Sequence, residues 1–262
     1  MIYKAKDILN FLINGKTKYR LHSPFVFNFV NSVLLDNRKY YAFDIINRIK
    51  KATHQHPQKI AIKDLGAGSN GQIKKERSLA SIVNKSAIKH KYGKLLFRLV
   101  NYYKPENIIE LGTCIGIGTM YLATGNLKSK LTTIEGDPSL AKIASNNFQK
   151  YPGDLSHIKQ VIGNFDDVLP NVLASYSKID LAFIDGNHRK EPTLNYFHQI
   201  LEYTDENSIL IFDDIHWSKE MMEAWATIQQ HPKVSLTIDI YRMGFVFFGN
   251  ERKEQEHFQL YF

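Results

Sequence analysis

Hydrophobic residues in the first third of the chain recur at helical spacing. This spacing predicts helices over residues 5–14 and over SPFVFNFVNSVLL at 23–35. Ser23 is a candidate N-cap of the second helix, and Pro24 stands at its first helical position. We therefore predict a mainly helical N-terminal extension over residues 1–84.

The pattern changes beyond a further helix predicted within residues 86–103, which Pro105 ends. Seven β-prone runs follow, at 107–111, 131–135, 159–163, 179–185, 208–213, 236–242 and 244–249. Segments able to hold a helix separate the first five runs, which predicts parallel strands joined by crossovers, whereas the last two runs are almost contiguous and predict a hairpin. Residues 85–262 are thus expected to form a doubly wound, Rossmann-like α/β domain. Its seven-stranded sheet would contain five parallel β/α units closed by an antiparallel C-terminal hairpin.

Composition narrows the class of protein. The 262 residues are 44% hydrophobic and 23% charged, as expected of a globular chain with a real core. Every apolar run is far shorter than the ~20 residues that span a bilayer. The single cysteine, Cys114, excludes an internal disulfide framework and suits a reducing compartment, so a cytoplasmic location is expected. The formal net charge of +8 is spread over short clusters, which favours a solvated basic face over a nucleic-acid site.

Two glycine-containing loops compete for a nucleotide cofactor. Such a loop follows a strand, opens an apolar helix and has an acidic residue about 20 positions further on to bind a ribose. The segment ELGTCIGIGT, from Glu110 to Thr119, meets these conditions. Its glycines are Gly112, Gly116 and Gly118, and Glu135 ends the next predicted strand. We predict that this loop binds the cofactor.

The other loop, DLGAGSNGQ at residues 64–72, contains a literal G-x-G-x-x-G pattern. Polar residues follow it, and residues 80–90 contain no acidic residue to receive a ribose. We predict a structural turn or a lid near the substrate, without a role in cofactor affinity.

The order of the elements and the GTCIGIG loop resemble class I S-adenosylmethionine-dependent methyltransferases. Within this class, the spacing is similar to the O-methyltransferases of the catechol and caffeoyl-CoA type over roughly residues 85–250. The N-terminal third resembles an extension of uncharacterised bacterial methyltransferases. The resemblance implies S-adenosylmethionine as cofactor and implies its contacts. Glu110 would lie near the methionine ammonium, Glu135 at the ribose diol and Asp166 near the adenine edge. The cofactor-binding set that we predict is Glu110, Gly112, Thr113, Gly116, Gly118, Glu135, Gly136 and Asp166. For Asp166 an alternative is open, because Asp166 or its neighbour Asp167 could simply cap a helix.

The same resemblance implies catalytic residues at the ends of the fourth and fifth strands. In the catechol-type enzymes an aspartate and an Asp-Asn pair bind Mg²⁺, and a basic residue removes the acceptor's proton. Asp185 matches the aspartate, His188 the base, and Asp213 with Asp214 lies at the pair. Histidine replaces the usual lysine, and no asparagine completes the pair. Asp185, Asp213 and Asp214 are therefore predicted ligands of Mg²⁺ or Mn²⁺, although loop histidines and strand-end carboxylates can also be structural.

The expected function is methyl transfer to an oxygen of a small molecule, with the N-terminal extension shaping the acceptor pocket. An alternative is an RNA or protein methyltransferase that uses the basic face, but the Asn-Pro-Pro-Tyr type of motif is absent and IDGNH stands in its place at 184–188. A short-chain dehydrogenase that binds NAD(P) is a weaker alternative, because no tyrosine has a lysine four residues later. A binding protein without turnover and a homodimer both stay open. The sequence does not identify the acceptor.

Overall fold

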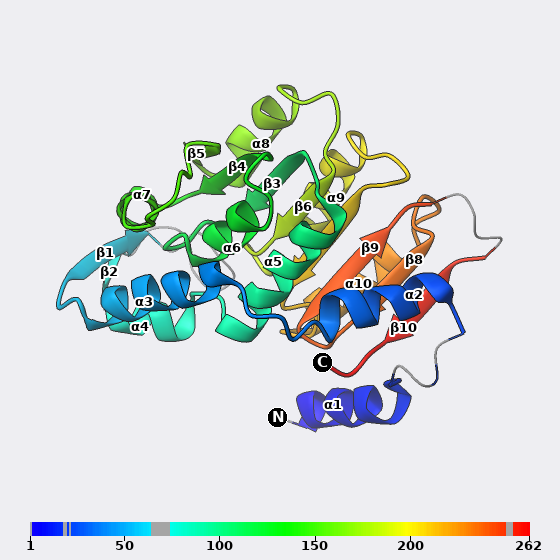
Figure 1. Ribbon diagram of the computed structural model, residues 1–262. Helices are drawn as coiled ribbons and strands as arrows, with labels where there is room; N and C mark the ends of the chain where they lie inside the picture. Colours follow the sequence, from blue (N-terminus) through cyan, green and yellow to red (C-terminus); the bar gives the residue numbers. More distant parts are fainter. Residues whose placement is uncertain (1, 18–19, 21, 64–73, 250–253) are drawn as a thin grey trace. The chain divides into compact units, whose positions relative to one another are not determined.

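The computed structural model describes residues 2–17, 20, 22–63, 74–249 and 254–262. The chain forms two compact units: one combines Met1–Val30 with Tyr176–Phe262, and the other is Asn31–Ser175 (Figure 1). This division runs through the predicted N-terminal extension and does not follow its end at residue 84. A predicted glycine-rich turn at residues 64–72 lies outside the described residues.

The unit Asn31–Ser175 contains the first three predicted β/α segments. Strand β4 (Lys130–Glu135) lies between β3 (Asn107–Leu111) and β5 (Ile158–Ile162), and both pairings are parallel. Strands β3 and β4 carry buried aliphatic side chains, as expected where helical crossovers cover a parallel sheet. The helices that follow the strands are α6 (Ile117–Gly125), α7 (Pro138–Gln149) and α8 (Phe165–Leu173).

The N-terminal part of this unit is mainly helical, as predicted, and also contains a strand pair that was not predicted. Helices α3 (Tyr41–Gln55), α4 (Leu79–Lys85) and α5 (His90–Tyr103) are present. Between α3 and α4, however, β1 (Lys59–Lys63) pairs antiparallel with β2 (Lys74–Ser78). The prediction of a mainly helical extension missed this pair because KKERS in β2 is too polar to suggest a strand. The segment at 64–72 therefore follows a strand of a two-stranded sheet, whereas the loop after β3 leads into a helix.

The other unit contains the last two parallel strands and the hairpin. Strand β6 (Leu181–Ile184) pairs in parallel with β7 (Ile209–Asp213). Strand β9 (Met243–Phe247) lies between β7 and β8 (Leu236–Asp239) and is antiparallel to both, which confirms the predicted hairpin. Strand β10 (Glu256–Gln259) pairs in parallel with β8 and is a strand beyond the seven that were predicted. The helices after β6 and β7 are α9 (Lys190–Leu201) and α10 (Lys219–Gln229).

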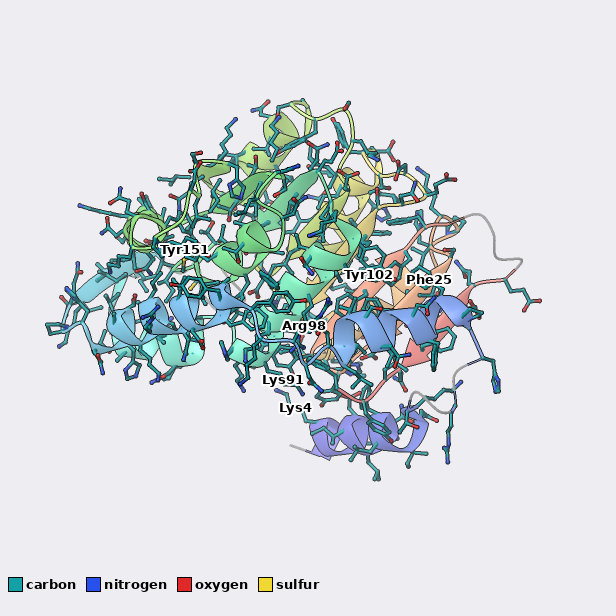
Figure 2. All side chains as sticks on the ribbon, viewed as in Figure 1. Lys4, Phe25, Lys91, Arg98, Tyr102 and Tyr151 are labelled. Carbon is teal, nitrogen blue, oxygen red and sulfur yellow. The ribbon has the colours of Figure 1, made fainter. Side chains whose placement is uncertain are left out.

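Residues near the N-terminus belong to this unit through aromatic and backbone contacts. Helix α2 (Pro24–Phe29) begins after Ser23, as predicted, although the serine side chain makes no cap hydrogen bond. Phe25, labelled in Figure 2, packs edge-to-face on Phe247 of β9. Helix α1 (Ile2–Asn14) is followed by a parallel β-bridge between Lys16 and Leu260. Within the described residues, no helix combines the length and the apolar character that a membrane span requires.

Candidate functional site

The loop between β3 and α6 has the backbone conformation expected of a close-approach loop. Gly112 has φ 107° and Gly116 has φ 79°, a region that favours glycine. A side chain at Gly116 would also meet the ring of Phe148, because an added Cβ would lie 2.5 Å from its Cε1. Cys114 adopts φ 50° between the two glycines. Gly118 is the second residue of α6, so no side chain projects from this position at the beginning of the helix.

Glu110 is a buried carboxylate at the end of β3. Its Oε2 accepts hydrogen bonds from Thr119 Oγ1 at 2.5 Å and from Thr133 Oγ1 at 2.6 Å. Its Oε1 is buried and has no hydrogen-bond partner among the described residues. Burial raises the pKa of Glu110 to about 7, opposed by the two threonine hydrogen bonds and reinforced by the charge of Glu135. An unpaired buried carboxylate oxygen is costly, so this atom is suited to a cationic ligand.

Thr113, predicted to bind the cofactor, belongs to the same polar network. Its hydroxyl lies 2.5 Å from that of Thr133, and both side chains are buried. Thr119 and Thr133 were not among the residues predicted for the site. The signal for Thr133 is its place in LTTIE, where it stands opposite Glu110 in the parallel register of β3 and β4.

Glu135 ends β4 and holds the loop after β3. Its Oε2 accepts from the backbone N–H of Cys114 at 2.7 Å, and its Oε1 accepts from the backbone N–H of Asp137 at 2.9 Å. The next residue, Gly136, also donates its backbone N–H to this carboxylate. Burial raises the pKa of Glu135 to about 7, opposed by these backbone hydrogen bonds. Asp137 caps α7 by accepting from Ser139 and Leu140.

Asp166 lies in the first turn of α8 and is exposed, as is Asp167. Asn164 is the N-cap residue of this helix, so neither aspartate occupies the cap position. Both carboxylates nevertheless lie in the first turn of the helix, where a negative charge interacts favourably with the helix dipole. The adenine contact of Asp166 stays a prediction.

The strand-end residues of the other unit form a second polar cluster. Asp185 directly follows β6, and His188 lies on the turn before α9. His188 Nε2 is 3.6 Å from Asp185 Oδ1 and 4.0 Å from Asp214 Oδ2. Asn187 supports the turn with φ 52° and donates its amide to the Tyr196 hydroxyl at 3.0 Å. The structure thus brings together three of the residues predicted for catalysis and metal binding.

Asp213, the other predicted metal ligand, is held by an arginine that the sequence analysis missed. Arg242 donates from Nε to Asp213 Oδ1 at 3.0 Å and from Nη2 to Asp213 Oδ2 at 2.6 Å. The same Nη2 is 3.6 Å from Asp214 Oδ1. Burial lowers the pKa of Arg242, but the hydrogen bonds and charge of Asp213 outweigh it, so the pKa is raised. The β7–β9 register places Met243 opposite Asp213, so its neighbour Arg242 lies beside Asp213, a placement that no sequence pattern indicated.

The donor set does not fit the predicted divalent ion. Both oxygens of Asp213 accept hydrogen bonds from a guanidinium, and a cation already lies between Asp213 and Asp214. The described part of the chain contains no group of three His, Cys, Asp or Glu residues that could hold a metal. The assignment of Asp185, Asp213 and Asp214 as metal ligands stays a prediction, which the pairing of Asp213 with Arg242 does not favour.

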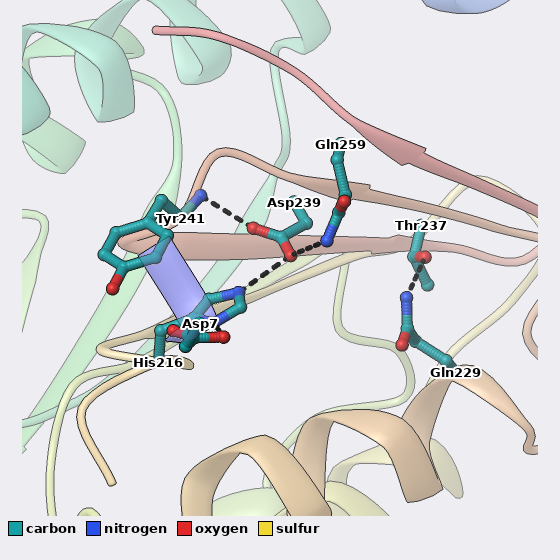
Figure 3. A network of polar contacts seen from close by, with 7 residues as sticks. All are labelled: Asp7, His216, Gln229, Thr237, Asp239, Tyr241 and Gln259. Carbon is teal, nitrogen blue, oxygen red and sulfur yellow. Dashed lines mark hydrogen bonds and ion pairs between the residues drawn. The ribbon is translucent and has the colours of Figure 1, made fainter. Parts of the chain in front are cut away.

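A buried ionic network lies beside this cluster (Figure 3). His216 approaches Asp7 through Nδ1 at 3.0 Å and Asp239 through Nε2 at 2.9 Å. Tyr241 stacks on the imidazole and donates its backbone N–H to Asp239. Burial lowers the pKa of His216, but the hydrogen bond to Asp239 and the charges of Asp239 and Asp7 raise it overall. His216 thus connects α1 to the β8–β9 corner that precedes Arg242.

Part of the chain matches a known protein family and named relatives. Residues 109–215 match a protein family described as a methyltransferase domain. The chain is 30% identical to a catechol O-methyltransferase of Niastella koreensis over 47% of its length and 55% of the relative's. It is 27% identical to a catechol O-methyltransferase of Mycobacterium tuberculosis over 49% of its length and 57% of the relative's. The matches thus span less than two thirds of these relatives.

Solved structures support the fold over most of the chain. An O-methyltransferase from Bacillus cereus in complex with SAH has a TM-score of 0.56 at 19% identity, over 85% of this chain and 97% of that one. The O-methyltransferase TomG from Streptomyces achromogenes in complex with SAM has a TM-score of 0.59 at 16% identity, over 84% and 95%. The chain therefore has the Rossmann-like fold of the O-methyltransferases.

Proposed function

Because residues 109–215 match a methyltransferase domain, we propose that this chain is an S-adenosylmethionine-dependent methyltransferase that acts on an oxygen of a small molecule. The observation that carries the proposal is the unpaired Oε1 of Glu110 beside the glycine loop. A cationic ligand, such as the ammonium of the cofactor's methionine part, would satisfy this oxygen. Two relatives are catechol O-methyltransferases, which favours an oxygen acceptor.

The cofactor would be held by residues of the unit Asn31–Ser175. Glu110 supplies a negative charge that burial leaves uncompensated, and Glu135 presents two carboxylate oxygens that keep acceptor capacity beyond their backbone hydrogen bonds. Gly112 and Gly116 let the backbone of the loop approach a ligand. When bound, S-adenosylmethionine supplies an electrophilic methyl group on a sulfonium.

The acceptor would be activated by the cluster of His188, Asp185 and Asp214. In the proposed reaction the acceptor oxygen forms a bond to the methyl carbon, the carbon–sulfur bond breaks, and His188 Nε2 takes the hydroxyl proton. Asp185 and Asp214, within 4.0 Å of this nitrogen, stabilise the imidazolium that forms. An imidazole is suited to this task because its ordinary pKa lies near neutrality. Asp7 of helix α1 contacts His216, which lies two residues after Asp214, and so supports the segment that carries Asp214.

Binding of S-adenosylhomocysteine, measured by calorimetry, tests the cofactor half of the proposal. Glu110→Gln removes the charge, and Glu106→Gln, at an exposed position just before β3, is the matched control. We expect the first variant to lose affinity and the control to bind as wild type. Absence of binding to the wild-type chain would overturn the proposal.

Transfer of a labelled methyl group to a panel of phenols, catechols, hydroxy acids, RNA and protein tests the acceptor half. We expect transfer to a small hydroxyl compound and a loss of ~10²-fold in His188→Ala, the usual contribution of a positioned base. His198→Ala, on α9, is the control. Transfer to RNA or protein alone would replace the proposed acceptor class, and full activity in His188→Ala would remove the base.

A further inference from the structure

The carboxylates at the ends of β6 and β7 are Asp185, Asp213 and Asp214, and Arg242 supplies a cation that contacts the last two. Asp213 is almost fully buried, and its two oxygens face the Nε and Nη2 atoms of Arg242 in a bidentate pair. This fork-to-fork geometry is the strongest form of an arginine–carboxylate contact. The Arg242 side chain is a quarter exposed and that of Asp213 is fully buried, so most of the pair is removed from water.

Asp214 lies between Arg242 and His188 and connects the two side chains. Nη2 of Arg242 lies 3.6 Å from Asp214 Oδ1, while Oδ2 of the same aspartate lies 4.0 Å from His188 Nε2. Asp214 has φ 54°, an uncommon conformation for a non-glycine residue, so the surrounding structure fixes its backbone. Arg242 is one of the groups in these surroundings.

We propose that Arg242 performs the role of a divalent ion at this cluster: it neutralises Asp213, positions Asp214 beside His188 and prevents a metal from binding there. Arg242 is thus a positioning residue that acts through Asp214. The inference rests on the proposed function only for the role of His188, because the exclusion of a metal is a property of the free protein. Removing the arginine would expose two adjacent carboxylates beside Asp185, and hard cations prefer such an oxygen donor set.

Mn²⁺ binding to the full chain, measured by calorimetry and by the electron spin resonance of the ion, tests the proposal without an acceptor. The wild-type chain is expected to show no saturable binding that depends on Asp213. Arg242→Ala is expected to bind Mn²⁺ at least on the order of tenfold more tightly, because ligand charges set the affinity of such sites. Arg242→Lys, which keeps the charge, should still exclude the ion. Arg189→Ala removes an exposed arginine of the same unit, which donates to the Asn187 amide and not to a carboxylate, and should behave as wild type.

The double variant Arg242→Ala with Asp213→Asn should lose the gained site, which would locate the ion at Asp213. Circular dichroism verifies that each variant is folded. Should Arg242→Ala fail to fold, the wild-type chain and Asp213→Asn still decide the question. Saturable Mn²⁺ binding by the wild-type chain that Asp213→Asn abolishes would overturn the proposal, as would a folded Arg242→Ala without any gain. Binding of S-adenosylhomocysteine, measured in the same samples, fails only if the proposed function fails.

Discussion

The backbone N–H of Cys114 donates to Oε2 of Glu135 at 2.7 Å, which ties the loop after β3 to the end of β4. The two residues are 21 positions apart. Because the second carboxylate oxygen accepts from Asp137, a single side chain fixes the loop and the beginning of α7. The proposed role of Glu135 in cofactor binding can be measured separately from its structural role in the loop.

Glu135→Ala should weaken the binding of S-adenosylhomocysteine by on the order of 1.5–3 kcal/mol, since a charged hydrogen-bond acceptor is lost. Glu135→Gln keeps one acceptor oxygen and should lose less. Calorimetry measures affinity, and thermal unfolding of the same samples measures the loss of the loop anchor. An unchanged affinity in a folded Glu135→Ala would exclude Glu135 from the cofactor site.

Glu110 should make the stability of the ligand-free protein depend on pH. Its pKa is raised from 4.5 to about 7 in the folded state, so the folded chain retains a proton that the unfolded chain releases. The resulting stabilisation is fully present below the unfolded pKa and is lost as pH rises through about 7. We expect Glu110→Gln to be more stable than wild type above that pH, by on the order of 1 kcal/mol or more, and to lack this advantage in acid. Urea unfolding at several pH values measures it, and parallel curves for both proteins would contradict the assignment.

Gly116 and Gly118 should respond differently to alanine. Gly116 has φ 79° and an added Cβ would meet Phe148, so Gly116→Ala should destabilise the chain by about 1–3 kcal/mol. Gly118 lies inside α6, where alanine is preferred over glycine by roughly 1 kcal/mol. Gly118→Ala should therefore be as stable as wild type and yet bind S-adenosylhomocysteine more weakly if the ligand approaches this residue. Thermal unfolding and calorimetry separate the two effects, and normal binding by Gly118→Ala would remove it from the site.

The His216 network should stabilise the chain most in mild acid. The groups that face the imidazole are Asp7, Asp239 and the stacked Tyr241, and the pKa of His216 is raised. The contribution is fully present below the unfolded pKa of about 6.5 and is lost as pH rises through the folded value. Asp7→Asn should consequently cost more stability near pH 6 than near pH 9, whereas Glu206→Gln, at an exposed site of the same unit, should cost little at either. Chemical unfolding at both pH values measures this difference, and an equal cost would show that His216 is not charged.

The ends of β3 and β4 were predictable because the sequence patterns that indicate them are local. An apolar run followed by an acidic residue and glycine identified Glu110 and its loop, and the next run identified Glu135. Both strands begin and end as predicted to within one residue. The predicted carboxylates are both buried: Glu110 stands opposite Thr133 in the parallel register of β3 and β4, and Glu135 is the last residue of β4. Strand β2 escaped prediction because its polar sequence pairs with β1 by backbone hydrogen bonds, which carry no hydrophobic period.

The sequence by itself determined the alternation of strands and helices, the closing hairpin and the positions of Glu110, Glu135, Asp185 and His188. Only the tertiary structure decided which charges neutralise each other. Arg242 and Asp213 are 29 residues apart and meet because β9 inserts antiparallel beside β7, while Asp7 reaches His216 across 209 residues. Hydrophobic periodicity indicates which face of an element is buried, and this information lies within a few neighbouring residues. The partner of a buried charge depends instead on strand order and register, which are properties of the packed chain. The tertiary structure was therefore needed to identify Arg242 as the cation at Asp213.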